Sequence, residues 1–239
     1  MTSSRGRVAG LLVSLTAVVL LGAGCGVIST VQNAVDTAGT LSGFADRLGK
    51  AAELTYTADY TIVGAEGGTI TLAQQPPRSA LSNGDNRLIS TTESMIICDD
   101  GECQRTPNNA AASAGPDAAA VAGVAGPAFV TPELALGLVA AAAIVPNTDV
   151  DTSEKKIAGQ DSLCADVTGI SDPQGGTEEL LQDFSVCVTE SGVLASFSGN
   201  SNTGAHGALE LVKYSESVDE ALFAPPSGAK VVDIPGLGG

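Results

Sequence analysis

Apolar and polar side chains alternate along much of the chain after residue 54, a pattern typical of β-strands with one buried face. In residues 54–62 threonine and aspartate fill one face, and the other face carries Leu54, Tyr56, Ala58, Tyr60 and Ile62. After a glycine turn, residues 69–74 place Ile70 and Leu72 on the inner face. This predicts two antiparallel strands that share one apolar face.

The same alternation predicts further short strands in both halves of the chain. They cover residues 78–82, 87–92, 95–98, 155–158, 163–170, 184–189, 193–198 and 207–214. In the strand at 184–189 the inner face holds Phe184, Val186 and Val188. About ten strands in succession predict one antiparallel meander that closes with residues 223–232.

Helical spacing appears in two places. Near the N-terminus Ser29 or Thr30 can cap a helix whose apolar stripe is Val31, Val35, Ala38, Leu41, Ala45 and Leu48; a flexible stalk is the alternative. Residues 107–147 are rich in Ala, Gly and Pro and lack alternation; residues 118–124 and a segment starting at Pro132 predict two helices, and a low-complexity loop is the alternative. The predicted fold is therefore α+β, a curved antiparallel sheet (half-barrel) whose concave face is covered by the N-terminal and central helices.

The first 24 residues have the plan of a secretory signal. Arg5 and Arg7 precede an apolar run of 14 residues, 8–21, which is shorter than the roughly 20 that a spanning helix needs. Small residues then precede Cys25, so the segment resembles a bacterial lipoprotein signal, although Gly22 stands where that signal usually has leucine. We expect a signal peptide at 1–24, a lipidated N-terminus and helix at 25–50, and one domain at 51–239. An ordinary signal peptide with Cys25 left as a free thiol is the alternative.

The other four cysteines form an even set, as in disulfide-bonded proteins outside the cytoplasm. Cys98 and Cys103 flank an Asp-Asp-Gly turn, and Cys164 and Cys187 lie on the outer faces of two predicted strands. We expect Cys98 to pair with Cys103 and Cys164 with Cys187. A zinc site is the competing hypothesis, but the chain has no Cys-x-x-Cys pair and a single histidine, His206.

Charge and motifs exclude several functions. The net charge is −16, and loss of Arg5 and Arg7 with the signal makes it −18; such a surface repels nucleic acid. The chain lacks Gly-x-Ser-x-Gly, His-Glu-x-x-His and phosphate-loop motifs, so no enzyme, cofactor or metal is expected. Two acidic groups lack the spacing of a calcium loop and are interpreted as solvated: Asp99, Asp100 and Glu102, and Asp149, Asp151 and Glu154.

The order of elements, with the ending Phe-Ala-Pro-Pro-Ser-Gly-Ala at residues 223–229, resembles the lipoprotein-carrier superfamily of LolA and LolB, a related periplasmic sigma-factor regulator and the actinobacterial lipid-carrier lipoproteins. The resemblance covers about residues 30–235. It implies an envelope lipoprotein on the outer face of the cell membrane that binds lipids or acylated ligands between sheet and helices.

The side chains expected to line such a site are Leu54, Tyr56, Tyr60, Ile62, Ile70, Leu72, Val186 and Val188. Three alternatives stay open. These side chains form a filled core with no cavity, or the chain is an envelope module for protein interaction or signalling that binds no lipid. The third is an envelope enzyme, which would need His206 or a cluster of acids in a cleft.

Overall fold

One large curved sheet carries the whole fold. The computed structural model describes residues 39, 42–63, 68–108, 118–125, 129–142, 145, 148–170, 181–204 and 206–235. Twelve strands lie side by side in the order β12-β6-β5-β4-β3-β2-β1-β11-β10-β9-β8-β7. Their bounds are β1 Tyr56–Val63, β2 Gly68–Gln75, β3 Arg78–Asn83, β4 Asn86–Ser90, β5 Ser94–Asp99, β6 Glu102–Pro107, β7 Asp149–Ile157, β8 Gln160–Thr168, β9 Leu181–Thr189, β10 Leu194–Ser201, β11 His206–Ser215 and β12 Lys230–Asp233.

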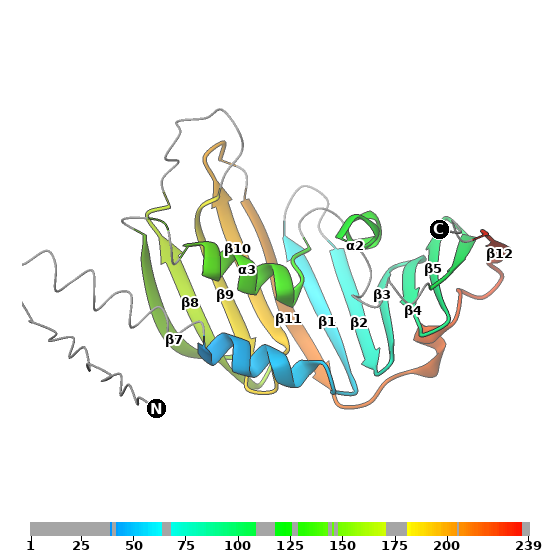
Figure 1. The fold of residues 1–239 in the computed structure, drawn as a ribbon, viewed down its shortest axis with the longest axis horizontal. Coiled ribbons are helices and arrows are strands. Elements are labelled where there is room, and N and C mark those ends of the chain that lie inside the picture. Colours follow the sequence, from blue (N-terminus) through cyan, green and yellow to red (C-terminus); the bar gives the residue numbers. More distant parts are fainter. Residues whose placement is uncertain are drawn as a thin grey trace, which may run out of the picture.

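Two consecutive runs of strands build this sheet and meet at its centre. Strands β1 to β6 form one antiparallel run and β7 to β11 form the other, and β1 pairs with β11 to join them. The alternation in the sequence translates directly into this arrangement, since Tyr56, Ala58 and Tyr60 on β1 are all buried. The predicted curved antiparallel sheet is thus confirmed, as Figure 1 shows.

Three helices lie in front of the concave face (Figure 1): an N-terminal helix at residues 42–51, α2 at Ala118–Ala125 and α3 at Pro132–Ala142. The sheet and helices share two apolar clusters. In the larger, Phe44 of the N-terminal helix and Val139 of α3 pack with residues of β1 and β8 to β11. In the smaller, Val121 and Val124 of α2 pack on Ile70.

The N-terminal helix is fixed to the β9–β10 turn by a close approach. Gly192 has a φ of +96°, and a Cβ added there would lie 2.0 Å from the Arg47 carbonyl oxygen. Only glycine fits this position, because other residues rarely adopt such a φ and would collide with the helix backbone. Arg47 also donates a hydrogen bond to the Val188 carbonyl, with 3.2 Å between Nη1 and oxygen.

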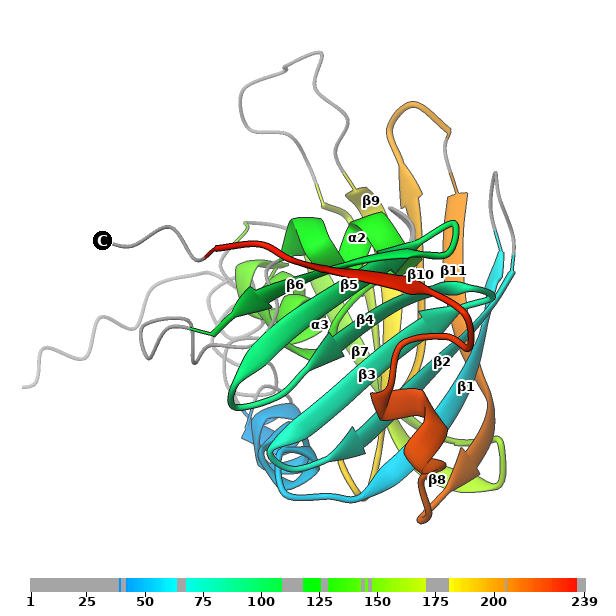
Figure 2. The ribbon, with the colours of Figure 1, turned by 90° about the vertical axis from the view of Figure 1, so that its right-hand side faces the viewer.

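The C-terminal segment, residues 216–235, covers the part of the convex face formed by β3 to β6. Figure 2 shows this segment passing over the sheet through the 3-10 helix η2, Glu220–Phe223, before β12 runs along β6. Leu222, Phe223 and Ala229 pack on a third apolar cluster that contains Ala80, Ile89, Ile96, Cys98 and Cys103. The two faces of the sheet therefore carry separate cores.

Three sequence expectations need correction. The sheet has twelve strands where about ten were expected, and β12 pairs with β6 in parallel, so the sheet is not one antiparallel meander. Phe223 lies in η2 and not in the closing strand. The acidic group Asp149, Asp151 and Glu154 lies on the edge strand β7, which begins six residues before the expected position.

The buried stripe of the N-terminal helix also differs from the prediction. Phe44 and Leu48 face the core, whereas Ala45 is exposed. The larger side chain at 44 gains more from burial than the methyl group at 45, which turns the helix by about one position. The rest of the expected stripe, at 31–41, lies outside the described residues.

Candidate functional site

A cavity of about 600 Å³ lies between the concave face of the sheet and the helices. The sheet supplies its floor and the three helices supply its walls. The lining residues are Leu48, Ala51, Ala52, Tyr56, Leu72, Gln74, Ser79, Ala80, Leu81, Leu88, Val121, Phe129, Thr131, Pro132, Leu136, Gly137 and Ala140. The alternative of a completely filled interior therefore does not hold for this half of the sheet.

Small residues on the helices leave this space open. Ala51, Gly137 and Ala140, with Ala52 just after the N-terminal helix, end at a methyl group or a hydrogen, so they do not reach across to the leucines of the floor. Over the other half of the sheet, Phe184 and Phe197 stack with 6.0 Å between ring centroids and fill the layer. The distribution of large and small side chains thus places the cavity over β1 to β4.

The chemistry of the lining is apolar and uncharged. None of the lining residues carries a charged side chain, and the polar ones are Tyr56, Gln74, Ser79 and Thr131. Two of these have structural partners: Gln74 donates to the carbonyls of Ala51 and Leu54, and the Thr131 hydroxyl caps α3 by accepting from the Leu134 amide at 3.3 Å. Such a lining, mostly apolar with a few polar atoms, suits hydrocarbon.

The eight residues predicted to line a lipid site fall into three groups. Tyr56 and Leu72 line the cavity. Four others are fully buried core side chains: Tyr60, Ile70, Val186 and Val188. Leu54 and Ile62 are partly buried against the same core. Alternation identifies which side chains face inward, but it does not tell the cavity from the packed part of the layer.

Tyr60 illustrates the packed part. Its ring meets Phe129 edge to face at 6.3 Å, and its hydroxyl donates to the Leu194 carbonyl at 3.0 Å. Burial, and secondarily the neighbouring Tyr56, raises the pKa of Tyr60 well above its ordinary value. Tyr60 therefore stays neutral and ties β1 to β10.

Both disulfides lie on the convex face, away from the cavity. They join Cys98 to Cys103 and Cys164 to Cys187, and each pair stands directly opposite on neighbouring antiparallel strands with 4.0 Å between Cα atoms. Cys164 and Cys187 pack with Ala195 outside the sheet, while Leu163, Ala165 and Val186 face inward. The strand phases read from the sequence are therefore those of the structure.

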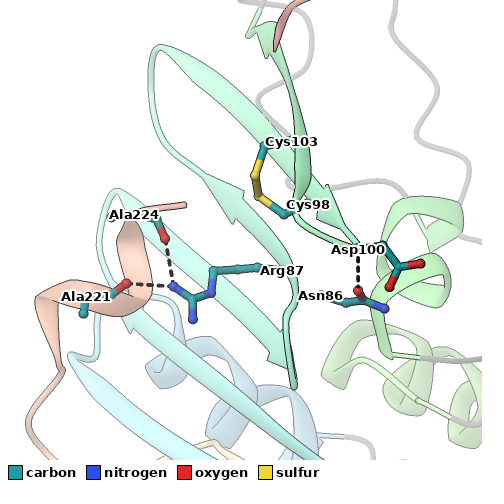
Figure 3. Close-up of a disulfide and its surroundings, with 7 residues drawn as sticks. All are labelled: Asn86, Arg87, Cys98, Asp100, Cys103, Ala221 and Ala224. Atoms are coloured by element: carbon teal, nitrogen blue, oxygen red, sulfur yellow. Dashed lines mark hydrogen bonds between the residues drawn. A yellow bond between two sulfur atoms is a disulfide. The ribbon is translucent and has the colours of Figure 1, made fainter. Parts of the chain in front are cut away.

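The Cys98–Cys103 disulfide lies near the hydrogen bonds that hold the C-terminal segment on the sheet (Figure 3). Arg87 Nη1 donates to the carbonyls of Ala221 and Ala224, each at 2.8 Å. Arg78 forms a bidentate pair with Glu220 at 2.9 and 3.0 Å, and its guanidinium lies 4.4 Å from the centre of the Phe223 ring. Hydrogen bonding to Arg78 lowers the pKa of Glu220, against a smaller opposing effect of desolvation.

The remaining candidate groups are on the surface. Asp99, Asp100 and Glu102 are exposed at the β5–β6 turn, where Asn86 accepts from the Asp100 amide (Figure 3). His206 is exposed at the start of β11 and contacts Asn200 at 2.9 Å. Within the described ranges, no three side chains among His, Cys, Asp and Glu are grouped as metal ligands would be.

Sequence reasoning missed the helical part of the lining. Leu136, Gly137 and Ala140 come from α3, and Phe129 precedes it. One signal points to them: in 118–125 and 132–142 nearly every residue is apolar, and Glu133 is the one charged residue. A surface helix normally has a charged or polar face.

Cys25 and the predicted signal at 1–24 lie outside the described residues. In the part that is described, no helix combines the length and the apolar character needed to cross a membrane.

No family model and no curated protein matches the sequence. Solved structures that match include the MucA/MucB complex of Pseudomonas aeruginosa, with 12% identity, a TM-score of 0.49, and coverage of 81% of this chain and 64% of that chain. LprF from Mycobacterium bovis matches with 13% identity, a TM-score of 0.38, and coverage of 80% and 98%. A LolA superfamily protein from Nitrosomonas europaea matches with 9% identity, a TM-score of 0.28, and coverage of 76% and 97%. At these identities the likeness concerns the fold alone.

Proposed function

We propose that this chain is an envelope lipoprotein, anchored through an acylated Cys25, that holds acyl chains of a lipid or an acylated ligand between its sheet and its helices. The observation that carries the proposal is the uncharged cavity of about 600 Å³ under α3. Its volume lies within the roughly 300–1,000 Å³ of small-molecule sites.

The binding energy would come from apolar burial. Each methylene group moved from water into the cavity contributes about 0.8 kcal/mol, so ten buried methylenes contribute about 8 kcal/mol before the costs of association. Leu72, Leu81 and Leu88 offer apolar contacts along the floor. Such a site selects for hydrocarbon length and shape more than for the headgroup.

The layers can separate to admit a chain. Ala135, Val139 and Ala142 of α3 meet the sheet through apolar contacts. Moving α3 outward leaves its internal helical hydrogen bonds intact, so opening exposes apolar surface without breaking the backbone pairing of the sheet.

A pair of glycine substitutions tests the cavity. Gly137 and Gly123 both lie in helices, and a Cβ added at either one meets nothing within 4 Å. Gly137 lines the cavity, whereas Gly123 does not belong to its lining. In a soluble Cys25→Ser form, we expect Gly137→Phe to reduce bound lipid and Gly123→Phe to leave it unchanged.

Native mass spectrometry of the soluble form, purified from its own envelope, gives the readout. Copurifying lipid, lost in Gly137→Phe, supports the proposal. If repeated preparations carry no lipid and added acylated ligands do not bind, the carrier function is wrong, and a partner found by crosslinking would then favour the envelope interaction module.

The anchor has its own test. Cys25→Ser in the full-length chain should abolish acylation and release the protein from membranes, because two or more acyl chains are what gives stable attachment. Metabolic labelling with a fatty acid and membrane fractionation measure this. Retention on membranes after the substitution would contradict the anchor and leave the cavity proposal untouched.

A further inference from the structure

The outward surface of α2 and α3 is free of charge among the side chains that the structure describes. The exposed residues are Leu134, Gly137, Ala140 and Ala141 on α3, and Ala122 and Gly123 on α2. Leu134 is 51% exposed. Helices that cover a core in water normally turn a polar face outward, whereas helices that are apolar all round lie in contact with another apolar phase.

This surface is unusual for the molecule around it. The whole chain has a net charge of −16, and the edge strand β7 presents Asp149, Asp151, Glu154, Lys155 and Lys156, all exposed. A strongly acidic protein is repelled by anionic headgroups and holds water at its charged faces. The helical face can therefore approach a lipid layer closely without removing water from any charged side chain that the structure describes on it.

The apolar face is continuous with the cavity. Gly137 and Ala140 are exposed and also line the cavity, so they form part of its rim. Leu134 lies one helical turn before Gly137, on the same side of α3. A hydrocarbon chain that leaves a bilayer at this face would enter the cavity without crossing open water.

We propose that this face of α2 and α3, centred on Leu134, is the surface that rests on a lipid bilayer while a ligand enters or leaves the cavity. The inference rests on the proposed function and adds the route of loading. The proposed tether permits it, because residues 26–41, between Cys25 and the described helix, can extend to at most about 56 Å. Among the side chains that the structure describes on this face, Leu134 is the one large exposed hydrophobic residue, so the contact is weak and reversible, as repeated loading and release require.

The test separates uptake from binding. In the soluble Cys25→Ser form, Leu134→Glu places a charge on the face without touching the cavity lining. The matched control is Val212→Glu, since Val212 is also 51% exposed, lies on β11 and does not belong to the lining of the cavity. Two measurements are made for each protein: the rate of uptake of pyrene-labelled phosphatidylcholine from phosphatidylcholine vesicles, and equilibrium binding of a short-chain pyrene lipid at concentrations where it is monomeric.

We expect Leu134→Glu to slow uptake from vesicles about tenfold, because a charge at the lipid interface opposes contact. Its equilibrium binding of the dissolved lipid should equal that of the parent protein, and Val212→Glu should change neither quantity. Equal uptake rates in all three proteins, or slowing by both substitutions, would overturn the inference.

Three other outcomes are decisive. If the parent protein binds the dissolved lipid but takes none from vesicles, the bilayer is not the donor and the inference fails, while the proposed function stands. If sedimentation shows that the parent protein is a dimer and Leu134→Glu a monomer, the face is an interface between copies and the inference fails. If the parent protein binds lipid in neither measurement, the proposed function itself fails.

Discussion

The two faces of the sheet are covered in different ways. On the concave side, α3 meets the strands through apolar side chains such as Val139, and a cavity remains beneath it. On the convex side, the C-terminal segment is attached by charged hydrogen bonds from Arg78 and Arg87 as well as by apolar packing. Directional bonds fix one geometry, whereas apolar contacts allow a layer to slide or lift.

This contrast suggests a division of tasks. The convex face carries both disulfides, which join β5 to β6 and β8 to β9, and the proposed movement for loading is confined to the helices of the concave face. If this is right, substitutions on the convex face lower stability without changing lipid binding, and substitutions at the rim of the cavity do the reverse.

The largest expected effect is that of removing a disulfide. Cys164 and Cys187 are 23 residues apart and Cys98 and Cys103 are 5 apart, so loop closure predicts losses of about 3.5 and about 2 kcal/mol for the two double alanine variants. Urea unfolding should show this order, with lipid binding retained below the transition. Loss of lipid binding in the folded variants would break the comparison between the faces.

Arg87→Ala should have the next largest effect. It removes two hydrogen bonds from a charged donor to the carbonyls of η2 and its end, and we expect a loss of about 1 to 2 kcal/mol and faster proteolysis near residue 224. Arg105→Ala is the control, because its ion pair with Asp233, at 3.3 Å, is largely exposed and contributes less than about 1 kcal/mol. Equal effects of the two variants would show that Arg87 does not fix the segment.

Tyr60→Phe examines the packed part of the concave side. Loss of the hydroxyl that donates to Leu194 should cost about 1 kcal/mol at neutral pH. Because burial raises the pKa of Tyr60, its contribution is complete below the unfolded value near 10 and declines as the pH rises above it. Raising the pH from about 9 to about 11 should therefore lower the free energy of unfolding of the parent protein more than that of Tyr60→Phe. Parallel pH profiles of the two proteins would contradict this assignment.

The smallest effect concerns Glu220. Its folded-state pKa is lowered by the hydrogen bond from Arg78, so its contribution is present above the unfolded value near 4.3 and is lost as the pH falls through the folded value. Glu220→Gln should unfold at slightly lower urea concentration than the parent protein at pH 7. The two midpoints should coincide below about pH 3, and a difference that persists there would exclude the ion pair as its cause.

Local sequence patterns predicted most of the fold. Alternation located the strands and the inner phase of Tyr56, Ile70 and Val186, because burial on one side of a pleated strand repeats every two residues. The same phase put Cys164 and Cys187 on the outer face, where a cross-strand disulfide can form. The proline after Thr131 gave the start of α3.

The pairing of distant strands and the position of the helices over the sheet could not be predicted from these patterns. The pairing of β12 with β6 joins segments more than 120 residues apart, and nothing in Lys230–Asp233 specifies its partner. Strand β7 was missed at its start because its charged residues do not alternate with apolar ones as those of a half-buried strand do. The cavity depends on where Ala-rich helices settle above the sheet, so only Tyr56 and Leu72 of the predicted lining are part of it.

An open sheet has edge strands whose unpaired N–H and C=O groups can pair with another molecule and so lead to aggregation. At the β7 edge, a second molecule paired in parallel and in register would have to place its own carboxylates and ammonium groups beside those of Asp149, Asp151 and Lys155. Like charges brought together in this way repel. Parallel in-register pairing of two copies at this edge is thus opposed by charge, even though β7 has a free side.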